Sequence, residues 1–231
     1  MPIESVSGRV AARSALFAVV VGLSSVLPAA ARAEAPVTAA AAGGQPMTAP
    51  PPAAGDWRHQ RQLSVMAGLA QWTLLRGGNV ALEYKVGRLA FEVSHGQGLD
   101  LNQAGGFDLS SAERDAGVQI RVPWTTGFGV GYRLTENLHV LIELKAHHYA
   151  LTGRDPTVRL DYTTFSVGPG VFYTIHLYRG LFLEPNVRYW PNVGSTLKGD
   201  QVAIRQPDGS IYEHHAHDFG LFANVNLGYT F

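Results

Sequence analysis

Apolar and polar residues alternate with a period of two along much of this 231-residue chain. The clearest run closes it, because every second residue from Phe219 to Phe231 is apolar. The opposite face of that run is small or polar, apart from Phe222. A side-chain period of two predicts a β-strand with one apolar face. One strand does not decide whether that face packs into a soluble core or faces lipid.

Seven further alternating segments are separated by turn signals, which gives eight predicted strands. They span about 62–75, 80–86, 89–101, 117–134, 138–151, 160–178 and 181–197, and the eighth runs to Phe231. The turns after strands two, four and six are short, at Gly87-Arg88, 135–137 and Arg179-Gly180. Long connections follow strands three, five and seven, so short and long connections alternate along the chain. Only the connection after the first strand departs from this alternation, because it is short where a long loop is expected. Short turns on one rim and long loops on the other are typical of bacterial outer-membrane barrels, with both termini on the short-turn, periplasmic rim.

Charged residues share the face opposite the apolar one. In the fifth strand, Leu138, Val140, Ile142 and Leu144 alternate with His139, Glu143 and Lys145. A lipid-facing barrel must turn its charged face inward. The residues expected in the lumen are Glu83, Lys85, Glu92, Arg121, Arg133, Glu143, Lys145, Glu184 and Arg188. Because an eight-stranded barrel is just wide enough to be filled by side chains, we interpret them as a salt-bridge network that plugs it. A narrow ion path is the alternative.

Two further residue types fit this architecture. Aromatic residues fall near strand ends, as an interfacial girdle requires. They are Tyr84, Tyr132, Tyr173, Tyr178 and Phe182 on one rim, and Trp124, Tyr162 and Tyr189 toward the other. Pro169, Pro185 and Pro191 interrupt predicted strands and are expected at bulges, since proline cannot donate a ladder hydrogen bond.

The N-terminal part of the chain has the pattern of an export signal. Arg9 and Arg13 precede an apolar stretch at 15–27, and Ala31 and Ala33 form a small-x-small cleavage site. The stretch is shorter than the about 20 apolar residues that a spanning helix needs. The sequence therefore predicts a cleaved signal peptide at 1–33. The Ala/Pro-rich segment 34–61 follows as a disordered linker, and a single barrel domain covers 62–231.

Composition excludes several classes of protein. The chain has no cysteine, which excludes disulfides, thiolate metal sites and a lipoprotein anchor. Lys plus Arg number 18 and Asp plus Glu number 18, so the formal net charge is zero. The composition therefore gives no indication of a nucleic-acid partner. With only 16% charged residues, a soluble secreted barrel of the lipocalin type is the less favoured alternative.

The signal peptide, the eight alternating segments, the turn 133–137 and the terminal 227–231 resemble small outer-membrane β-barrel proteins. The relevant relatives are the transmembrane domain of outer membrane protein A and outer membrane protein X. The resemblance covers about residues 62–231. It implies an all-β, eight-stranded antiparallel transmembrane barrel in contact with outer-membrane lipid. It also implies that Tyr229 and Phe231 are read by the barrel-assembly machinery. Function does not follow, because these proteins share a barrel without sharing a role.

Candidate chemistry is sparse. His147-His148 and the His214, His215, His217 cluster lack a specific metal spacing, although His215 and His217 would share a face of an extended strand. Ser94-His95 suggests the lipid A deacylases, but the serine of that motif stands two residues after its histidine, where this chain has Gln97. Adjacent strand residues also point to opposite faces. We therefore expect no enzyme, no cofactor and no metal site.

The long loops 102–116 and 198–217 are the expected functional surface, since loops on a rigid scaffold carry recognition. The turn Pro207–Ser210 predicts that 201–205 and 211–215 extend strands seven and eight as a hairpin. The sequence does not identify the ligand of these loops. The preferred role is structural or in surface interaction. The alternatives are a narrow pore or conduit for small hydrophobic molecules and, more distantly, a lipid-modifying enzyme.

Overall fold

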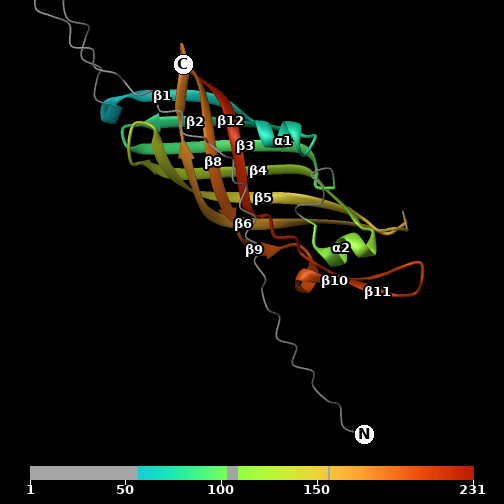
Figure 1. Cartoon of the computed structure of the whole chain (residues 1–231). Coiled ribbons are helices and arrows are strands. Elements are labelled where there is room, and N and C mark those ends of the chain that lie inside the picture. The colour runs from blue at the N-terminus through green and yellow to red at the C-terminus, as the bar shows by residue number, and fades with distance from the viewer. Residues whose placement is uncertain (1–56, 103–108, 156) are drawn as a thin grey trace, which may run out of the picture. The chain divides into compact units, whose positions relative to one another are not determined.

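A computed structural model describes residues 57–102, 109–155 and 157–231. The predicted signal peptide, its cleavage residues Ala31 and Ala33 and most of the linker lie outside these ranges. Strands dominate the described part, as the alternation predicts (Figure 1). They are β1 (Arg61–Gly68), β2 (Gly78–Val86), β3 (Leu89–Asp100), β4 (Gln119–Arg133), β5 (Leu138–Thr152), β6 (Arg159–Tyr173), β7 (Ile175–Tyr178), β8 (Leu181–Trp190), β9 (Asn192–Ser195), β10 (Gln201–Arg205), β11 (Ile211–His215) and β12 (Gly220–Thr230).

The strands close into an eight-stranded antiparallel barrel, which confirms the predicted fold class. The terminal strand β12 makes the closure by pairing with β8 on one side and with β1 on the other. Ser64 is opposite Thr230 in the closing pair, and the Phe231 N–H donates to the Leu63 carbonyl over 2.9 Å. Closure leaves no open sheet edge, which is the condition for a sheet to cross a bilayer.

Two predicted strands are each broken into two pieces. The segment 160–178 divides at Thr174 into β6 and β7, because the Thr174 N–H bonds the Asn137 carbonyl in the adjacent turn. The segment 181–197 divides at Pro191, whose nitrogen carries no hydrogen, into β8 and β9. Pro169 and Pro185, in contrast, lie within continuous strands.

The first strand is shorter than the predicted 62–75. It ends at Gly68, and the short helix α1 (Leu69–Thr73) follows. The Asn224 side chain of β12 accepts a hydrogen bond from the Ala70 N–H over 3.0 Å. A Cβ at Gly68 would lie 2.2 Å from Gln71 Oε1, so the Gln71 side chain packs directly over this glycine where the chain changes direction.

The barrel is apolar outside and polar inside. In β5, Ile142 and Leu144 each keep 57% of their surface exposed, whereas Glu143 is fully buried and Lys145 is buried as well. This is the reverse of a soluble protein, in which large apolar side chains fill the interior. Tyr84, Tyr132, Tyr173, Tyr178, Trp124 and Tyr189 lie on the outside as predicted.

Phe182 and Tyr162 do not join this girdle. Both side chains are buried in the interior, because they are in phase with the inward residues of their strands. Phe182 packs over the backbone of β12, where a Cβ at Gly228 would lie 2.2 Å from its ring. The predicted interfacial position of these two residues is therefore wrong.

The long connections carry structure of their own. The loop predicted at 102–116 contains helix α2 (Ser111–Ala116). The hairpin predicted at 201–215 is present, with Gln201 opposite His215. It is a separate two-stranded sheet and does not extend the barrel strands. Two single 3-10 turns, η1 (Trp57–His59) and η2 (Lys198–Asp200), complete the elements. None of the described helices is long and apolar enough to cross a bilayer.

Candidate functional site

The barrel interior holds a charge network in two layers. The layer nearer the short-turn rim contains Glu83, Lys85, His139 and Glu184. Lys85 Nζ lies 2.7 Å from Glu83 Oε2 and 3.8 Å from Glu184 Oε1. His139 Nε2 lies 2.9 Å from Glu83 Oε1. Glu83, His139 and Glu184 could offer metal ligands within 4.8 Å of one another, but the Lys85 ammonium already supplies the positive charge between the two carboxylates.

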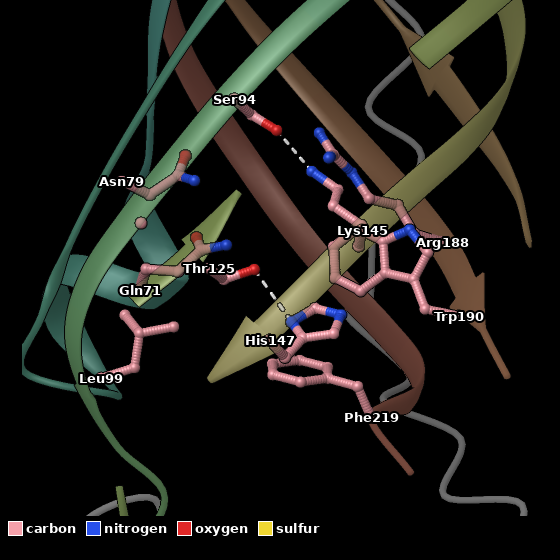
Figure 2. A pocket seen from close by; sticks show the side chains of 11 residues that line it. Gln71, Asn79, Ser94, Leu99, Thr125, Lys145, His147, Arg188, Trp190 and Phe219 are labelled. Atoms are coloured by element: carbon pink, nitrogen blue, oxygen red, sulfur yellow. Dashed lines mark hydrogen bonds between the residues drawn. The ribbon is translucent and has the colours of Figure 1, made fainter. Parts of the chain in front are cut away.

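The second layer contains Glu92, Glu143, Lys145 and Arg188. Arg188 Nη1 lies 3.0 Å from Glu143 Oε1 and 3.3 Å from Glu92 Oε1. Lys145 Nζ lies 3.4 Å and 4.0 Å from the same two carboxylates and donates to Ser94 Oγ (Figure 2). These bonds cross the barrel, since Glu92 belongs to β3, Glu143 to β5 and Arg188 to β8.

Neighbouring polar and aromatic groups complete the second layer. Trp190 Nε1 donates to Glu143 Oε2 over 3.2 Å, and Arg188 Nε donates to Asn186 Oδ1 over 2.9 Å. The Arg188 guanidinium also lies over the Phe172 ring, 4.6 Å from its centre. Buried charges need such paired and hydrogen-bonded surroundings to be tolerated.

Arg133 covers the short-turn end of the interior. Its guanidinium lies 4.8 Å from the centre of the Trp57 ring and donates to the Gly87 carbonyl over 3.2 Å. Weaker bonds of 3.4 Å reach the carbonyls of Trp57 and Glu136. The segment just before β1 therefore packs against this end of the barrel.

Arg121 is the one predicted lumen residue that lies outside, with 67% of its side chain exposed. A register shift between Arg121 and Trp124 in the pairing of β4 with β5 explains the error. On one side of the shift Ile120 and Val122 point inward, and on the other Gly127 and Gly129 do. The strict alternation that placed Arg121 with Arg133 is lost at this bulge.

The space left between these side chains is small. A cavity of about 20 Å³ lies between the second layer and the long-loop end, bordered by Lys145, His147, Arg188 and Trp190 (Figure 2). It has room for about one water molecule.

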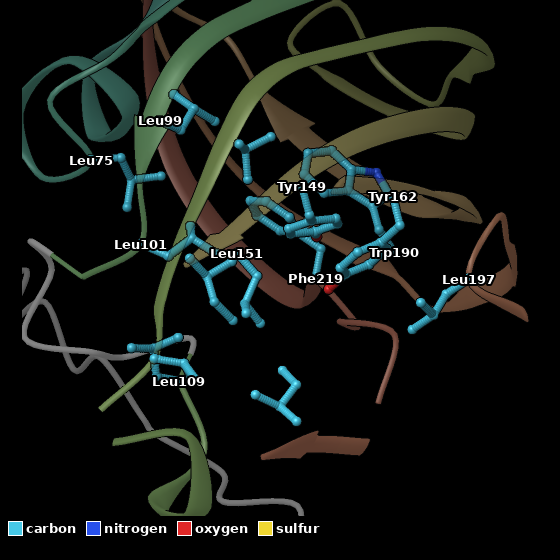
Figure 3. Packing of buried hydrophobic residues seen from close by; sticks show 14 residues of the cluster. Leu75, Leu99, Leu101, Leu109, Tyr149, Leu151, Tyr162, Trp190, Leu197 and Phe219 are labelled. Carbon is cyan, nitrogen blue, oxygen red and sulfur yellow. The ribbon is translucent and has the colours of Figure 1, made fainter. Parts of the chain in front are cut away.

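Beyond this cavity the interior becomes apolar. A cluster centred on Tyr149, Tyr162, Trp190 and Phe219 fills the long-loop end (Figure 3). The Tyr149 and Tyr162 rings stack with centres 5.3 Å apart. Side chains from the long connections, such as Leu109 of the loop before α2, join the same cluster.

A second group of ionisable residues lies at the long-loop end, where α2 meets the segment after β11. Glu113 of α2 forms a capping box: its Oε2 accepts from the Ser110 N–H over 2.6 Å, and its own N–H donates to Ser110 Oγ over 3.2 Å. Its other oxygen, Oε1, faces His214 Nδ1 at 3.7 Å and His217 Nδ1 at 3.9 Å.

Two tyrosines fix the histidines of this group. The Tyr162 hydroxyl lies 2.9 Å from His214 Nε2 and accepts from the His217 N–H over 3.2 Å. The Tyr212 hydroxyl lies 3.4 Å from His214 Nδ1. Burial lowers the pKa of His214 to about 4. Burial alone would raise the pKa of Glu113, but His217 and the Ser110 N–H bring it below its usual value. His214 is therefore neutral and Glu113 ionised at pH 7.

This group opens onto a cleft of about 310 Å³ between α2 and the hairpin. The cleft is bordered by Ser110, Ala112, Glu113, Tyr212, Glu213, His215, Ala216, His217 and Asp218. The predicted pairing of His215 with His217 is wrong: β11 ends at His215, so the extended geometry is lost, and His214 meets His217 at Glu113 instead.

The other candidate residues are separated. Ser94 points into the barrel and His95 points outward, where it bonds Thr126. His147 is inside, whereas its neighbour His148 stacks on Trp124 outside. These placements give no nucleophile–base pair at Ser94-His95.

Comparisons with known proteins add little to this geometry. No family model and no curated protein matches the sequence. Among solved structures, the chain is similar to a major outer membrane protein from Thermus thermophilus. The two are 14% identical, with a TM-score of 0.37, and the match covers 75% of this chain and all of the other. The fold assignment therefore rests on the strand pairing described above.

Sequence reasoning missed two parts of the site. His139 was assigned to the inward face of its strand but was not counted in the charge network, and Tyr162 was detectable because it is in phase with the inward residues of its strand. The contact of Glu113 with His214 and His217 was not, because about a hundred residues separate them and only the closed barrel brings their loops together.

Proposed function

We propose that this chain is an integral outer-membrane barrel with a structural or surface-interaction role and a plugged lumen. The observation that carries the proposal is the inversion of its faces: apolar side chains ring the outside while ion pairs fill the inside. An exterior of this kind needs lipid, since soluble monomers rarely expose apolar patches of such extent.

The orientation we propose puts the short-turn rim and both barrel ends in the periplasm, and the long connections outside the cell. The short turns, the tyrosines of that rim and the Trp57 cover support it, because they match the arrangement of bacterial barrels. The proposed partners are outer-membrane lipid and, during biogenesis, the barrel-assembly machinery, which would read Tyr229 and Phe231. Both side chains are exposed, Tyr229 on β12 and Phe231 directly after it.

The plug is favoured over a pore or a hydrophobic conduit by the filling of the interior. Ion pairs occupy the half near the short turns, and the cluster around Tyr149 and Trp190 occupies the other. A lipid-modifying enzyme is disfavoured because Ser94 and His95 point to opposite faces.

Two measurements test this proposal. Folded protein in detergent should migrate differently on a gel before and after boiling, because a closed ladder resists unfolding until heated. Equal migration together with a helical circular dichroism spectrum would contradict the assignment as a membrane barrel.

Reconstituted in planar bilayers, the folded protein should pass no stepwise current, while a conducting porin prepared in the same way serves as the control for insertion. Stepwise current from the wild-type protein would make a pore the better assignment. Surface labelling of the loop 198–217, but not of the turn 135–137, on intact cells would support the orientation, and the opposite pattern would reverse it.

A further inference from the structure

We propose that three arginines at the short-turn rim, Arg61, Arg88 and Arg179, bind the phosphate groups of anionic phospholipids such as phosphatidylglycerol. We call these residues the rim arginines. Such a lipid contact presupposes the membrane barrel proposed above, because only an embedded barrel brings lipid headgroups to its rim.

The rim arginines lie on neighbouring strands and turns of the closed barrel. Arg179 is in the turn between β7 and β8, Arg61 begins β1, and Arg88 is in the turn between β2 and β3. The sheet order β7-β8-β12-β1-β2-β3 places them along one continuous arc of the rim. All three residues are exposed. They therefore present their charge to the same sector of the surrounding membrane.

Little negative charge accompanies the rim arginines. Among the described residues of the short-turn rim, Glu136 is the one exposed acidic residue, and it lies in the turn between β4 and β5, outside the arc. Glu83 and Glu184 are buried in the interior, where Lys85 lies near both. None of the rim arginines forms an ion pair with a described residue, the terminal carboxylate of Phe231 included. The arc is thus positively charged beside an apolar exterior, which complements an anionic headgroup with acyl chains.

Two rim arginines are held at the level of the exposed tyrosines. Arg88 Nη1 donates to the Tyr132 hydroxyl over 2.7 Å, and its guanidinium lies 5.7 Å from the centre of that ring. The Arg179 guanidinium lies 5.0 Å from the centre of the Tyr178 ring. Outward tyrosines of a membrane barrel mark the headgroup level, because the ring is apolar and the hydroxyl is polar. The two guanidinium groups therefore lie at the depth of the lipid phosphates.

The chemistry of arginine suits a phosphate ligand. A guanidinium is planar, carries five N–H donors and can bind two phosphate oxygens at once. Among the described residues, Tyr132 accepts the one hydrogen bond that the Arg88 side chain donates. That bond orients the guanidinium beside the ring and leaves its other donors for a headgroup.

The backbone at Arg179 indicates that the turn itself does not require an arginine. Arg179 has a φ of 46° and Gly180 a φ of 84°, so both residues of this two-residue turn are in the left-handed region. Asparagine or glycine is favoured at the first position of such a turn, because other side chains are unfavourable there. An arginine at this position points to a contact outside the turn, which a lipid phosphate supplies.

The test is native mass spectrometry of the folded, full-length protein with an equimolar mixture of phosphatidylglycerol and phosphatidylcholine that carry the same acyl chains. The wild-type protein should retain phosphatidylglycerol in preference to phosphatidylcholine, whose headgroup has no net charge. The rim variant carries Arg61→Gln, Arg88→Gln and Arg179→Gln. Its ratio of bound phosphatidylglycerol to bound phosphatidylcholine should be at least about 10-fold lower, since each basic residue near an anionic headgroup adds to the attraction.

A control variant separates the arc from the total charge of the protein. Three exposed arginines outside the short-turn rim serve for it, and the variant carries Arg121→Gln, Arg159→Gln and Arg205→Gln. It loses the same charge as the rim variant and should keep the wild-type preference. An equal loss in both variants would overturn the arc as the binding site. Stronger retention of lipid A than of phosphatidylglycerol by the wild-type protein would overturn the choice of a phospholipid.

Refolding into phosphatidylcholine vesicles, followed by the gel shift on boiling, distinguishes failure of the lipid contact from failure of the barrel. The wild-type protein and both variants should all be heat-modifiable in these vesicles. Heat-modifiable wild-type protein that retains the two phospholipids equally would overturn the lipid contact and leave the membrane barrel standing, whatever the variants do. Wild-type protein that enters no vesicle would overturn the barrel and the lipid contact together.

Discussion

Replacing Arg188 with glutamine is the sharpest test of the plug. Arg188 is buried and bridges Glu92 and Glu143 at 3.3 Å and 3.0 Å. The substitution keeps a polar side chain but removes the charge. The two carboxylates would then share only Lys145, which lies 3.4 Å from one and 4.0 Å from the other.

The expected loss of unfolding free energy follows because two buried carboxylates would face a single ammonium group. Removing one partner of a buried ion pair leaves an uncompensated charge and costs about 3–5 kcal/mol. The substitution also removes the hydrogen bond from Arg188 Nε to Asn186 Oδ1, which adds to the loss of stability. If water reached the network freely, the cost would fall to the at most about 1 kcal/mol typical of exposed pairs.

The assay is reversible urea unfolding in detergent or lipid, followed by tryptophan fluorescence. Arg121→Gln is the matched control, since Arg121 is the same residue type but lies outside, 4.0 Å from Asp100. It should lose at most about 1 kcal/mol. A further variant that combines Arg188→Gln with Glu143→Gln should recover part of the loss. The reasoning is refuted if Arg188→Gln loses no more stability than Arg121→Gln, and a stable variant with altered bilayer current would favour the pore.

Two further predictions concern closure of the barrel. Gly168→Ala should destabilise it by about 3 kcal/mol, because a Cβ there would lie 1.6 Å from the Tyr189 carbonyl oxygen, whereas Gly194→Ala has nothing within 4 Å and should have little effect in the same urea assay. Deleting Phe231 should lower the amount of heat-modifiable protein in outer-membrane fractions. Ile211→Asp, at another exposed apolar residue that lies in the hairpin, should not lower it, and normal assembly without Phe231 would contradict its role as a signal.

The faces of the barrel were predictable because each strand reports its own orientation. The alternation in β5 separates Ile142 and Leu144 from Glu143 and Lys145 without any knowledge of the neighbouring strands. The hairpin β10–β11 was equally local, since its turn and both strands lie within 201–215. Features that depend only on a few adjacent residues can therefore be predicted from the sequence.

Errors arose where a distant contact changes the local pattern. The bulge after Arg121 reverses which residues face inward, and Pro123 within it gave no indication of the direction. The end of β1 at Gly68 depends on Asn224 of the last strand. The meeting of Glu113 with His217 depends on closure of the whole barrel. None of these partners is near in sequence.

Part of the charge network is already set within single strands, before the barrel closes. Glu83 and Lys85, and likewise Glu143 and Lys145, are two residues apart and so share the inward face of one strand. Acids and bases balance in each layer once Arg133, at the short-turn end, is counted with the first. The pairs are Glu83 and Glu184 with Lys85 and Arg133, and Glu92 and Glu143 with Lys145 and Arg188.

Local neutrality of each layer matters because water cannot screen charges in a filled interior, so an excess of either sign would be costly in every folded molecule. The strands therefore supply acid and base together, and closure only has to align them. On this argument a substitution that removes one charge should be harmful, while a matched removal of one acid and one base from the same layer should be tolerated far better.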